Sequence, residues 1–180
     1  MKSKETLKTV LYFVILAAIL IGLRVFVFTP VNVKGDSMDP TLADGERTIA
    51  LKNSEIKRFD IVTFPAPDEP GQTYIKRVIG LPGDTVEYKD DTLYINGKKY
   101  AEPYLNQYKN ELTDGLPLTN EFTLKEVTGK AKVPKGELFV LGDNRRISKD
   151  SRMIGMIKEK NISGDVKFVL WPLDRFGTID

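Results

Sequence analysis

The chain begins with a pattern of polar and apolar positions that differs from the rest. Residues 1–8 are polar and mostly basic, and an uninterrupted apolar run follows over residues 10–23. With Arg24 and the apolar residues up to Phe28, the segment from Thr9 has 20 residues. As a helix it would be about 30 Å long, which matches the hydrocarbon core of a bilayer. We therefore predict a transmembrane anchor over residues 9–29, with Arg24 reaching toward the interface.

The lysines before the apolar run predict its orientation. Basic residues stay on the cytoplasmic side, so residues 1–8 should be cytoplasmic and residues 30–180 extracytoplasmic, in a single-pass protein of the cell membrane. A cleavable signal peptide has a similar start, but Ala17 and Ala18 lie inside the apolar run and no small-x-small site in a polar context follows. A buried core helix is the other alternative, since the strictly apolar run has only 14 residues.

After Pro30 the pattern changes to short alternating or apolar runs separated by turns rich in Gly, Pro, Asp and Asn. Such runs are typical of strands. We expect strands near residues 31–33, 47–51, 59–64, 73–79, 85–88, 92–95, 98–100, 137–141, 162–166 and 168–172. Residues 101–130 are polar and should form an irregular excursion, which makes 85–132 a variable β-ribbon or loop insertion. The expected fold is mostly β, a barrel or sandwich behind one N-terminal transmembrane helix.

The predicted strand at 73–79 carries a cation on each face. Alternation places Lys76 with Tyr74 on one face and Arg77 with Ile75 on the other. A lysine among apolar neighbours is unusual, although an edge strand can use a lysine against aggregation. Burial and the neighbouring Arg77 would both lower the pKa of Lys76.

Composition excludes several classes of site. The chain has 27 basic and 25 acidic residues, a net charge of +2, and no basic stripe that would predict a nucleic-acid partner. It has no cysteine and no histidine. This excludes disulfides, thiol nucleophiles, the Ser-His-Asp triad and metal sites built on either residue, and we predict no metal or cofactor. An enzyme of this composition must use carboxylates, lysine or tyrosine for proton transfer.

Three interpretations of the chemistry remain. A serine nucleophile with a lysine base would use Ser37, in the loop GDSMDPTL, whose composition also suits an ordinary turn. Ser54 and Lys57 form a bare Ser-x-x-Lys pattern in a polar span, which predicts a surface position. A metal or phosphate site on Asp143 and Asp150 would lack the calcium-loop pattern. A non-enzymatic anchored β module would explain the charged loop but not Lys76.

Four stretches and a closing stretch, in the order in which they occur along the chain, resemble the type I signal peptidases of the short, Gram-positive-like bacterial kind with one membrane anchor. They are residues 35–42, 58–62, 74–84 and 142–152, and the closing residues 171–177. The resemblance runs over residues 1–177 and is weakest over 85–132. It implies a membrane serine endopeptidase that removes signal peptides from secreted preproteins. A self-cleaving Ser-Lys protease and an inactive anchored module remain as alternatives.

The resemblance also implies roles for single residues. Ser37 would be the nucleophile, Lys76 the general base, and Ser148 would position the lysine amine. The active-site loop would be held by two ion pairs, Arg77 with Asp143 and Arg152 with Asp150. Shallow pockets for the small residues of an Ala-x-Ala site would be lined by Val31, Val33, Met38, Tyr74 and Ile75. Some members carry a serine as oxyanion donor where this chain has Gly35, so the Ser37 backbone N–H would carry more of that stabilisation. The implied partners are preproteins, the lipid bilayer and, by proximity, the secretion translocon.

Overall fold

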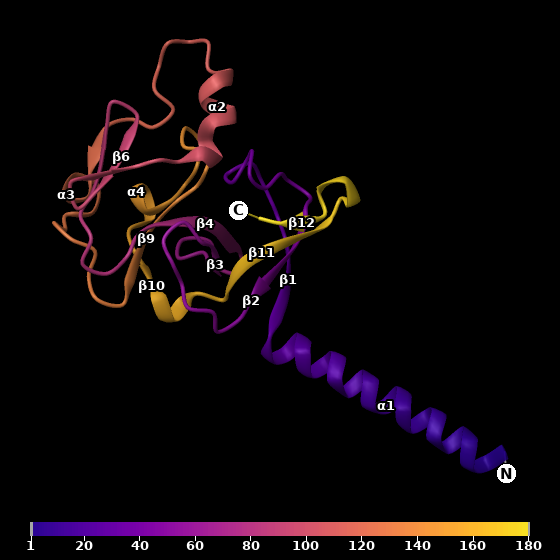
Figure 1. Ribbon diagram of the computed structural model, residues 1–180. Helices are drawn as coiled ribbons and strands as arrows, with labels where there is room; N and C mark the ends of the chain where they lie inside the picture. The colour runs from indigo at the N-terminus through magenta and orange to yellow at the C-terminus, as the bar shows by residue number, and fades with distance from the viewer. Residues whose placement is uncertain (1, 180) are drawn as a thin grey trace.

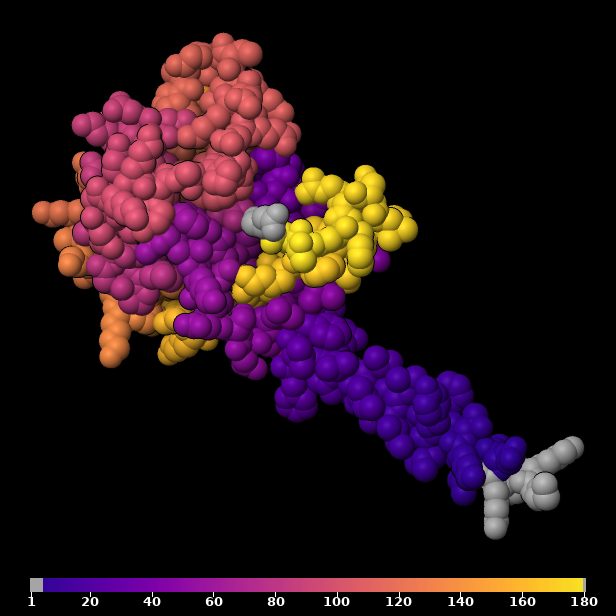
Figure 2. Space-filling view, in the orientation of Figure 1, coloured from indigo at the N-terminus to yellow at the C-terminus, as the bar shows by residue number. Residues whose placement is uncertain are grey.

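The N-terminal helix stands apart from the rest of the protein. The computed structural model describes the backbone of residues 2–179 and the side chains of residues 5–179. Helix α1 (Lys2–Phe26) projects away from a β-rich body (Figures 1 and 2). Its segment Glu5–Phe26 is long and apolar enough to cross a membrane, and none of it is buried in the protein. The helix ends at Phe26, and Phe28 and Thr29, at the end of the predicted anchor, already belong to the first strand.

The body consists of two antiparallel sheets, which confirms the mostly-β expectation. The larger sheet has the strand order β1-β2-β11-β3-β4-β9-β10, and β12 pairs with β11. Its strands are β1 (Phe28–Asn32), β2 (Arg47–Leu51), β3 (Ile61–Pro65), β4 (Thr73–Gly80), β9 (Glu137–Leu141), β10 (Ile157–Lys158), β11 (Gly164–Trp171) and β12 (Gly177–Thr178). The smaller sheet has the order β7-β6-β5-β8, from β5 (Val86–Lys89), β6 (Thr92–Ile95), β7 (Lys98–Tyr100) and β8 (Phe122–Thr123). The two strands expected at 162–166 and 168–172 are one strand, β11, with two register shifts against β2.

The predicted insertion is more ordered than its polar composition indicates. The expected irregular stretch contains the 3-10 turn η1 (Pro103–Leu105) and two short helices, α2 (Asn106–Glu111) and α3 (Leu124–Thr128). Helix α3 begins with a capping box, in which Thr123 and Glu126 each bond the other's backbone N–H. The remaining short helical elements are α4 (Ser151–Ile154), η2 (Glu159–Asn161) and η3 (Leu173–Arg175). Helices this short show no usable hydrophobic period, so the sequence pattern missed them.

Strand β4 lies in the middle of the larger sheet, between β3 and β9. Apolar clusters cover it: Ile75 belongs to one, Val78 to a second and Ile79 to a third that joins the smaller sheet to the larger. The edge-strand explanation for Lys76 is therefore wrong. Both Lys76 and Arg77 are buried, at 3% and 2% exposure, because their strand is flanked by β3 and β9 and packed against these clusters.

Candidate active site

Ser37 lies in the loop between β1 and β2. Gly35 has φ +74°, a left-handed conformation that suits glycine, and its N–H donates to Asp44 Oδ1 at 2.7 Å. The side chains of Met38 and Leu42 are buried in the core and anchor the loop. Ser37 itself stays half-buried, with its hydroxyl directed at β4. The loop is thus a turn held to the core by the apolar residues that follow the serine.

The amine of Lys76 meets the Ser37 hydroxyl. Lys76 Nζ donates to Ser37 Oγ at 2.8 Å and to the carbonyl oxygen of Ile75 at 2.9 Å. Burial lowers the pKa of Lys76 from 10.5 to about 8, while the charges of Asp150 and Asp143 act in the opposite direction. A lysine with this pKa is neutral often enough near pH 7 to accept a proton.

Arg77 does not act on Lys76 as the sequence predicted. Its guanidinium forms a two-pronged ion pair with Asp143, with Nε–Oδ1 at 2.9 Å and Nη2–Oδ2 at 2.7 Å. It also donates to the carbonyl oxygen of Phe59 and lies 3.8 Å from the centre of the Tyr104 ring. Since its charge is compensated by Asp143, burial alone accounts for the lowered pKa of Lys76, and the expected repulsion between the two cations is wrong.

Both ion pairs expected in the loop of residues 142–152 are present. The second joins Arg152 to Asp150, with Nε–Oδ1 and Nη2–Oδ2 both at 2.8 Å. Asp150 also caps α4 and accepts from the N–H of Gly142 at 3.1 Å. Because Asp143 and Asp150 are each engaged by an arginine, the metal-site interpretation has no support. No group of three or more acidic side chains that could hold a metal ion occurs in the described residues.

Gly142 allows this loop to approach the nucleophile. A Cβ at this position would lie 2.1 Å from Ser148 Oγ and 2.4 Å from the Ser37 carbonyl oxygen. The same carbonyl accepts from the N–H of Asn144 at 3.1 Å. Ser148 therefore lies beside the serine–lysine pair, but its buried hydroxyl has no hydrogen-bond partner in the described part of the chain. The bond to the lysine amine that the resemblance implies is not formed in this structure.

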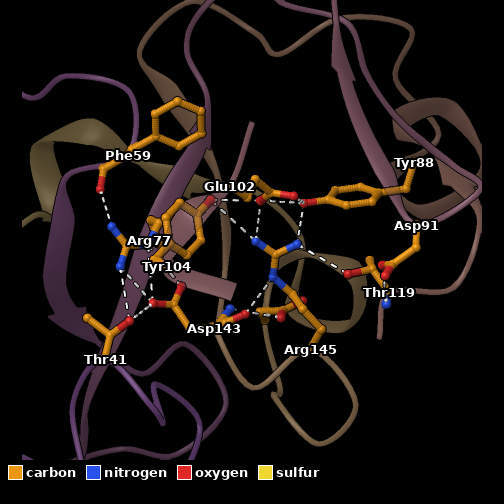
Figure 3. Close-up of polar contacts among 12 residues, drawn as sticks. Thr41, Phe59, Arg77, Tyr88, Asp91, Glu102, Tyr104, Thr119, Asp143 and Arg145 are labelled. Carbon is orange, nitrogen blue, oxygen red and sulfur yellow. Dashed lines mark hydrogen bonds and ion pairs between the residues drawn. The ribbon is translucent and has the colours of Figure 1, made fainter. Parts of the chain in front are cut away.

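A buried polar cluster behind this loop was not found from the sequence (Figure 3). Arg145, at 2% exposure, donates to the Gly142 carbonyl at 2.9 Å and pairs with Glu102 at 2.5 Å. Tyr88 and Tyr104 donate their hydroxyls to Glu102 as well. Arg145 stands among other charged loop residues and Glu102 in a polar insertion, so neither had a local signal that distinguished it. The cluster ties the insertion to the active-site loop.

A cavity of about 280 Å³ opens beside the serine–lysine pair. Four of the five residues expected to bind substrate line it, namely Val33, Met38, Tyr74 and Ile75. The fifth, Val31, packs against the neighbouring core cluster and is not among the described residues that line this cavity. The remaining wall was not predicted from the sequence and includes Ile147, Glu69 and Lys149. Ser54, by contrast, hydrogen-bonds Asp165 at 3.4 Å and takes no part in this site.

Comparison with known proteins agrees with this arrangement. Residues 4–171 match the family model described as "Signal peptidase, peptidase S26". The chain is 53% identical to signal peptidase I of Bacillus caldolyticus, over 86% of this chain and 85% of that one. It is 45% identical to signal peptidase IB of Staphylococcus aureus, over 97% and 94% of the two chains.

Among solved structures, a signal peptidase I from Enterococcus faecalis is similar, with a TM-score of 0.60 and 47% identity. The match covers 62% of this chain and 97% of that one. The family model spans nearly the whole chain, and two relatives are 45% and 53% identical to it. These findings establish the family of the chain. The chain belongs to the signal peptidase family, peptidase S26.

Proposed function

We propose that this protein is a membrane-anchored serine endopeptidase that removes signal peptides from secreted preproteins, with Ser37 as nucleophile and Lys76 as general base. Family membership supports the reaction class. The observation that carries the assignment of residues is the 2.8 Å contact between Ser37 Oγ and the amine of a buried lysine. A nucleophile and a base within hydrogen-bond reach are what covalent catalysis requires.

The proposed reaction starts with neutral Lys76. It accepts the Ser37 proton as Oγ attacks the scissile carbonyl, and the resulting oxyanion is stabilised by the Ser37 backbone N–H. Protonated Lys76 then donates to the leaving amine, which gives an acyl-enzyme. The same lysine activates water for deacylation. Asp143 and Asp150 hold the surrounding loop through their arginines. Ser148, on the same loop and near the backbone of Ser37, would position the lysine amine after a rearrangement of its side chain.

The cavity beside Ser37 and Lys76 supports binding of the residues that precede the scissile bond, because it opens next to the nucleophile. A preference for small side chains there is an expectation from the family resemblance. Val33, Met38, Tyr74 and Ile75 would contact the residues before the scissile bond, as in an Ala-x-Ala site. Val31 lacks this support and stays a prediction from the resemblance.

The proposed topology has residues 1–8 in the cytoplasm, an anchor over 9–29 and the catalytic domain outside. The exposed apolar helix α1 supports contact with a lipid bilayer. The lysines in residues 1–8 support the orientation. The substrates are preproteins that bear signal peptides, and proximity to the secretion translocon follows from where such substrates emerge.

The proposal is tested by incubating the membrane-inserted protein with a preprotein that carries an Ala-x-Ala site. Wild type should release the mature protein, while Ser37→Ala and Lys76→Ala should release none. Ser54→Ala is the matched control and should behave as wild type, because its hydroxyl bonds Asp165 instead of the active site. Processing at the normal rate by either active-site variant would overturn the assignment. A self-cleaving protease would instead shorten its own chain, which gel electrophoresis of the same reaction mixture would reveal.

A further inference from the structure

Tyr108 reaches the nucleophile loop from the insertion. It lies on α2, which Figure 1 shows beside the loop between β1 and β2. Its hydroxyl donates a short hydrogen bond to Asp39 Oδ2 and accepts from Asn144 Nδ2 at 3.2 Å. One hydroxyl thus joins the loop that carries Ser37 to the loop that carries Asp143. The sequence pattern indicates no role for this part of the insertion.

Both partners of Tyr108 control the backbone around Ser37. The N–H of Asn144 donates to the Ser37 carbonyl oxygen at 3.1 Å, which fixes the peptide group after the nucleophile. The N–H of Asp39 donates to the Asp36 carbonyl oxygen at 3.2 Å and closes the turn in which Ser37 lies. The peptide group before the nucleophile, which holds the Ser37 N–H, is part of that turn. The hydroxyl of Tyr108 therefore connects the supports on either side of the serine.

Core packing does not explain why α2 lies here, since none of its residues is buried. Its tyrosine instead makes a hydrogen bond to a carboxylate, a type about twice as strong as a neutral one. Burial and the bond to Asp39 raise the pKa of Tyr108, so its hydroxyl stays protonated and remains a donor throughout the neutral range. The hydroxyl can therefore donate to Asp39 at the pH values at which the enzyme works.

We propose that Tyr108 is a positioning residue for peptide cleavage, which holds Asp39 and Asn144 together so that the Ser37 N–H and hydroxyl point at the scissile carbonyl. This inference rests on the proposed function, because it concerns the same serine. Tyr108 touches neither the serine side chain nor Lys76, so its effect passes through the two loops. Misplacing a reacting group by a fraction of an ångström lowers the rate of the chemical step more than it weakens substrate binding.

The test is the steady-state kinetics of Tyr108→Phe with an Ala-x-Ala preprotein or peptide. This change removes one oxygen and keeps the ring of a half-buried side chain. We expect kcat to fall about tenfold or more while KM stays within about twofold, because the lost geometry matters in the transition state. Tyr94→Phe is the matched control. It lies in the same insertion, its hydroxyl has no hydrogen bond among the residues that the structure describes, and its kinetics should equal wild type.

Substitutions at Asp39 separate positioning from a general structural effect. Asp39→Ala should lower kcat as much as Tyr108→Phe, and the double variant should be no slower than either single one, since each breaks the same bridge between the two loops. Asp39→Asn keeps an oxygen that accepts from Tyr108, so this variant should keep most of the kcat that Asp39→Ala loses. A thermal melt of each variant shows whether it is folded at the assay temperature, and kcat is compared only between folded variants.

The inference is overturned by an unchanged kcat in Tyr108→Phe, by a loss that lies wholly in KM, or by a loss that matches the fraction unfolded. It is also overturned if the effects at Tyr108 and Asp39 multiply in the double variant. Failure of the proposed function has a different signature, because wild type and Ser37→Ala would then process the preprotein equally. The two failures are therefore distinguishable in one set of assays.

Discussion

Lys76 should govern how cleavage depends on pH. Burial lowers its pKa from 10.5 to about 8, a difference that corresponds to about 3 kcal/mol. At pH 7 about one Lys76 in ten would then be neutral, against about one free lysine in 3,000. Because only the neutral amine can accept the Ser37 proton, kcat/KM should rise about tenfold per pH unit below pH 7 and level off above pH 8.

The assay follows cleavage of an Ala-x-Ala peptide by the detergent-solubilised protein between pH 5 and pH 10. Melting curves at each pH ensure that the protein stays folded. A rate that does not change between pH 5 and pH 9 would refute Lys76 as the base. A rise that levels off only above pH 10 would refute the effect of burial.

The same pKa predicts a stability effect. Since the pKa of Lys76 is lower in the folded than in the unfolded state, the unfolded chain binds more protons between pH 8 and about 10.5. The cost of burying the ammonium is fully present below pH 8 and disappears as the pH rises through this window. Lys76→Met should therefore melt higher than wild type at pH 6, by an advantage that shrinks toward pH 10. An advantage that grows with pH would contradict this reasoning.

Two further predictions concern the supports of the site. Glu102→Gln should destabilise the protein by about 3–5 kcal/mol in chemical unfolding, because it leaves the buried guanidinium of Arg145 without its counter-charge. Asp114→Asn breaks the exposed ion pair with Arg146, the residue that follows Arg145, and should change the stability far less than Glu102→Gln does. Equal losses in the two variants would refute the role of burial. Gly142→Ala should abolish cleavage, since its Cβ would lie 2.4 Å from the Ser37 carbonyl oxygen. Gly177→Ala meets nothing within 4 Å and should keep full activity, so a retained rate in Gly142→Ala would show that the loop can move aside.

What the sequence could predict was local in origin. The apolar run became α1, and most alternating runs became strands close to the expected bounds, because hydrophobic period depends on neighbours in the chain. The absence of histidine and cysteine left a serine with a lysine base as one of few chemistries, and the family resemblance pointed to Ser37 and Lys76. The structure brings these two residues, 39 positions apart, within 2.8 Å. The ion pairs of Asp143 and Asp150 followed from the family resemblance.

What the sequence could not predict depends on tertiary contacts between polar residues. Glu102 and Arg145 are 43 positions apart, and nothing near either residue indicates the other. The hydroxyl of Tyr108 meets Asp39 across 69 positions for the same reason. The effect of Arg77 on Lys76 was misjudged because adjacency in a strand says nothing about which charge is already neutralised. Polar pairing of this kind becomes visible only once the strands are in register.

The join between α1 and β1 consists of Val27 alone. Lys52, in the turn after β2, holds this join in place: its N–H donates to the Val27 carbonyl oxygen at 2.8 Å and its amine donates to the Val25 carbonyl oxygen at 2.9 Å. Phe28 is already paired with Leu51. With α1 in a bilayer, a connection of one residue would hold Ser37 at a nearly constant distance from the membrane surface. Peptide bonds in a translocated chain would then be selected by their depth as well as by their side chains, and folded domains farther from the membrane would stay out of reach.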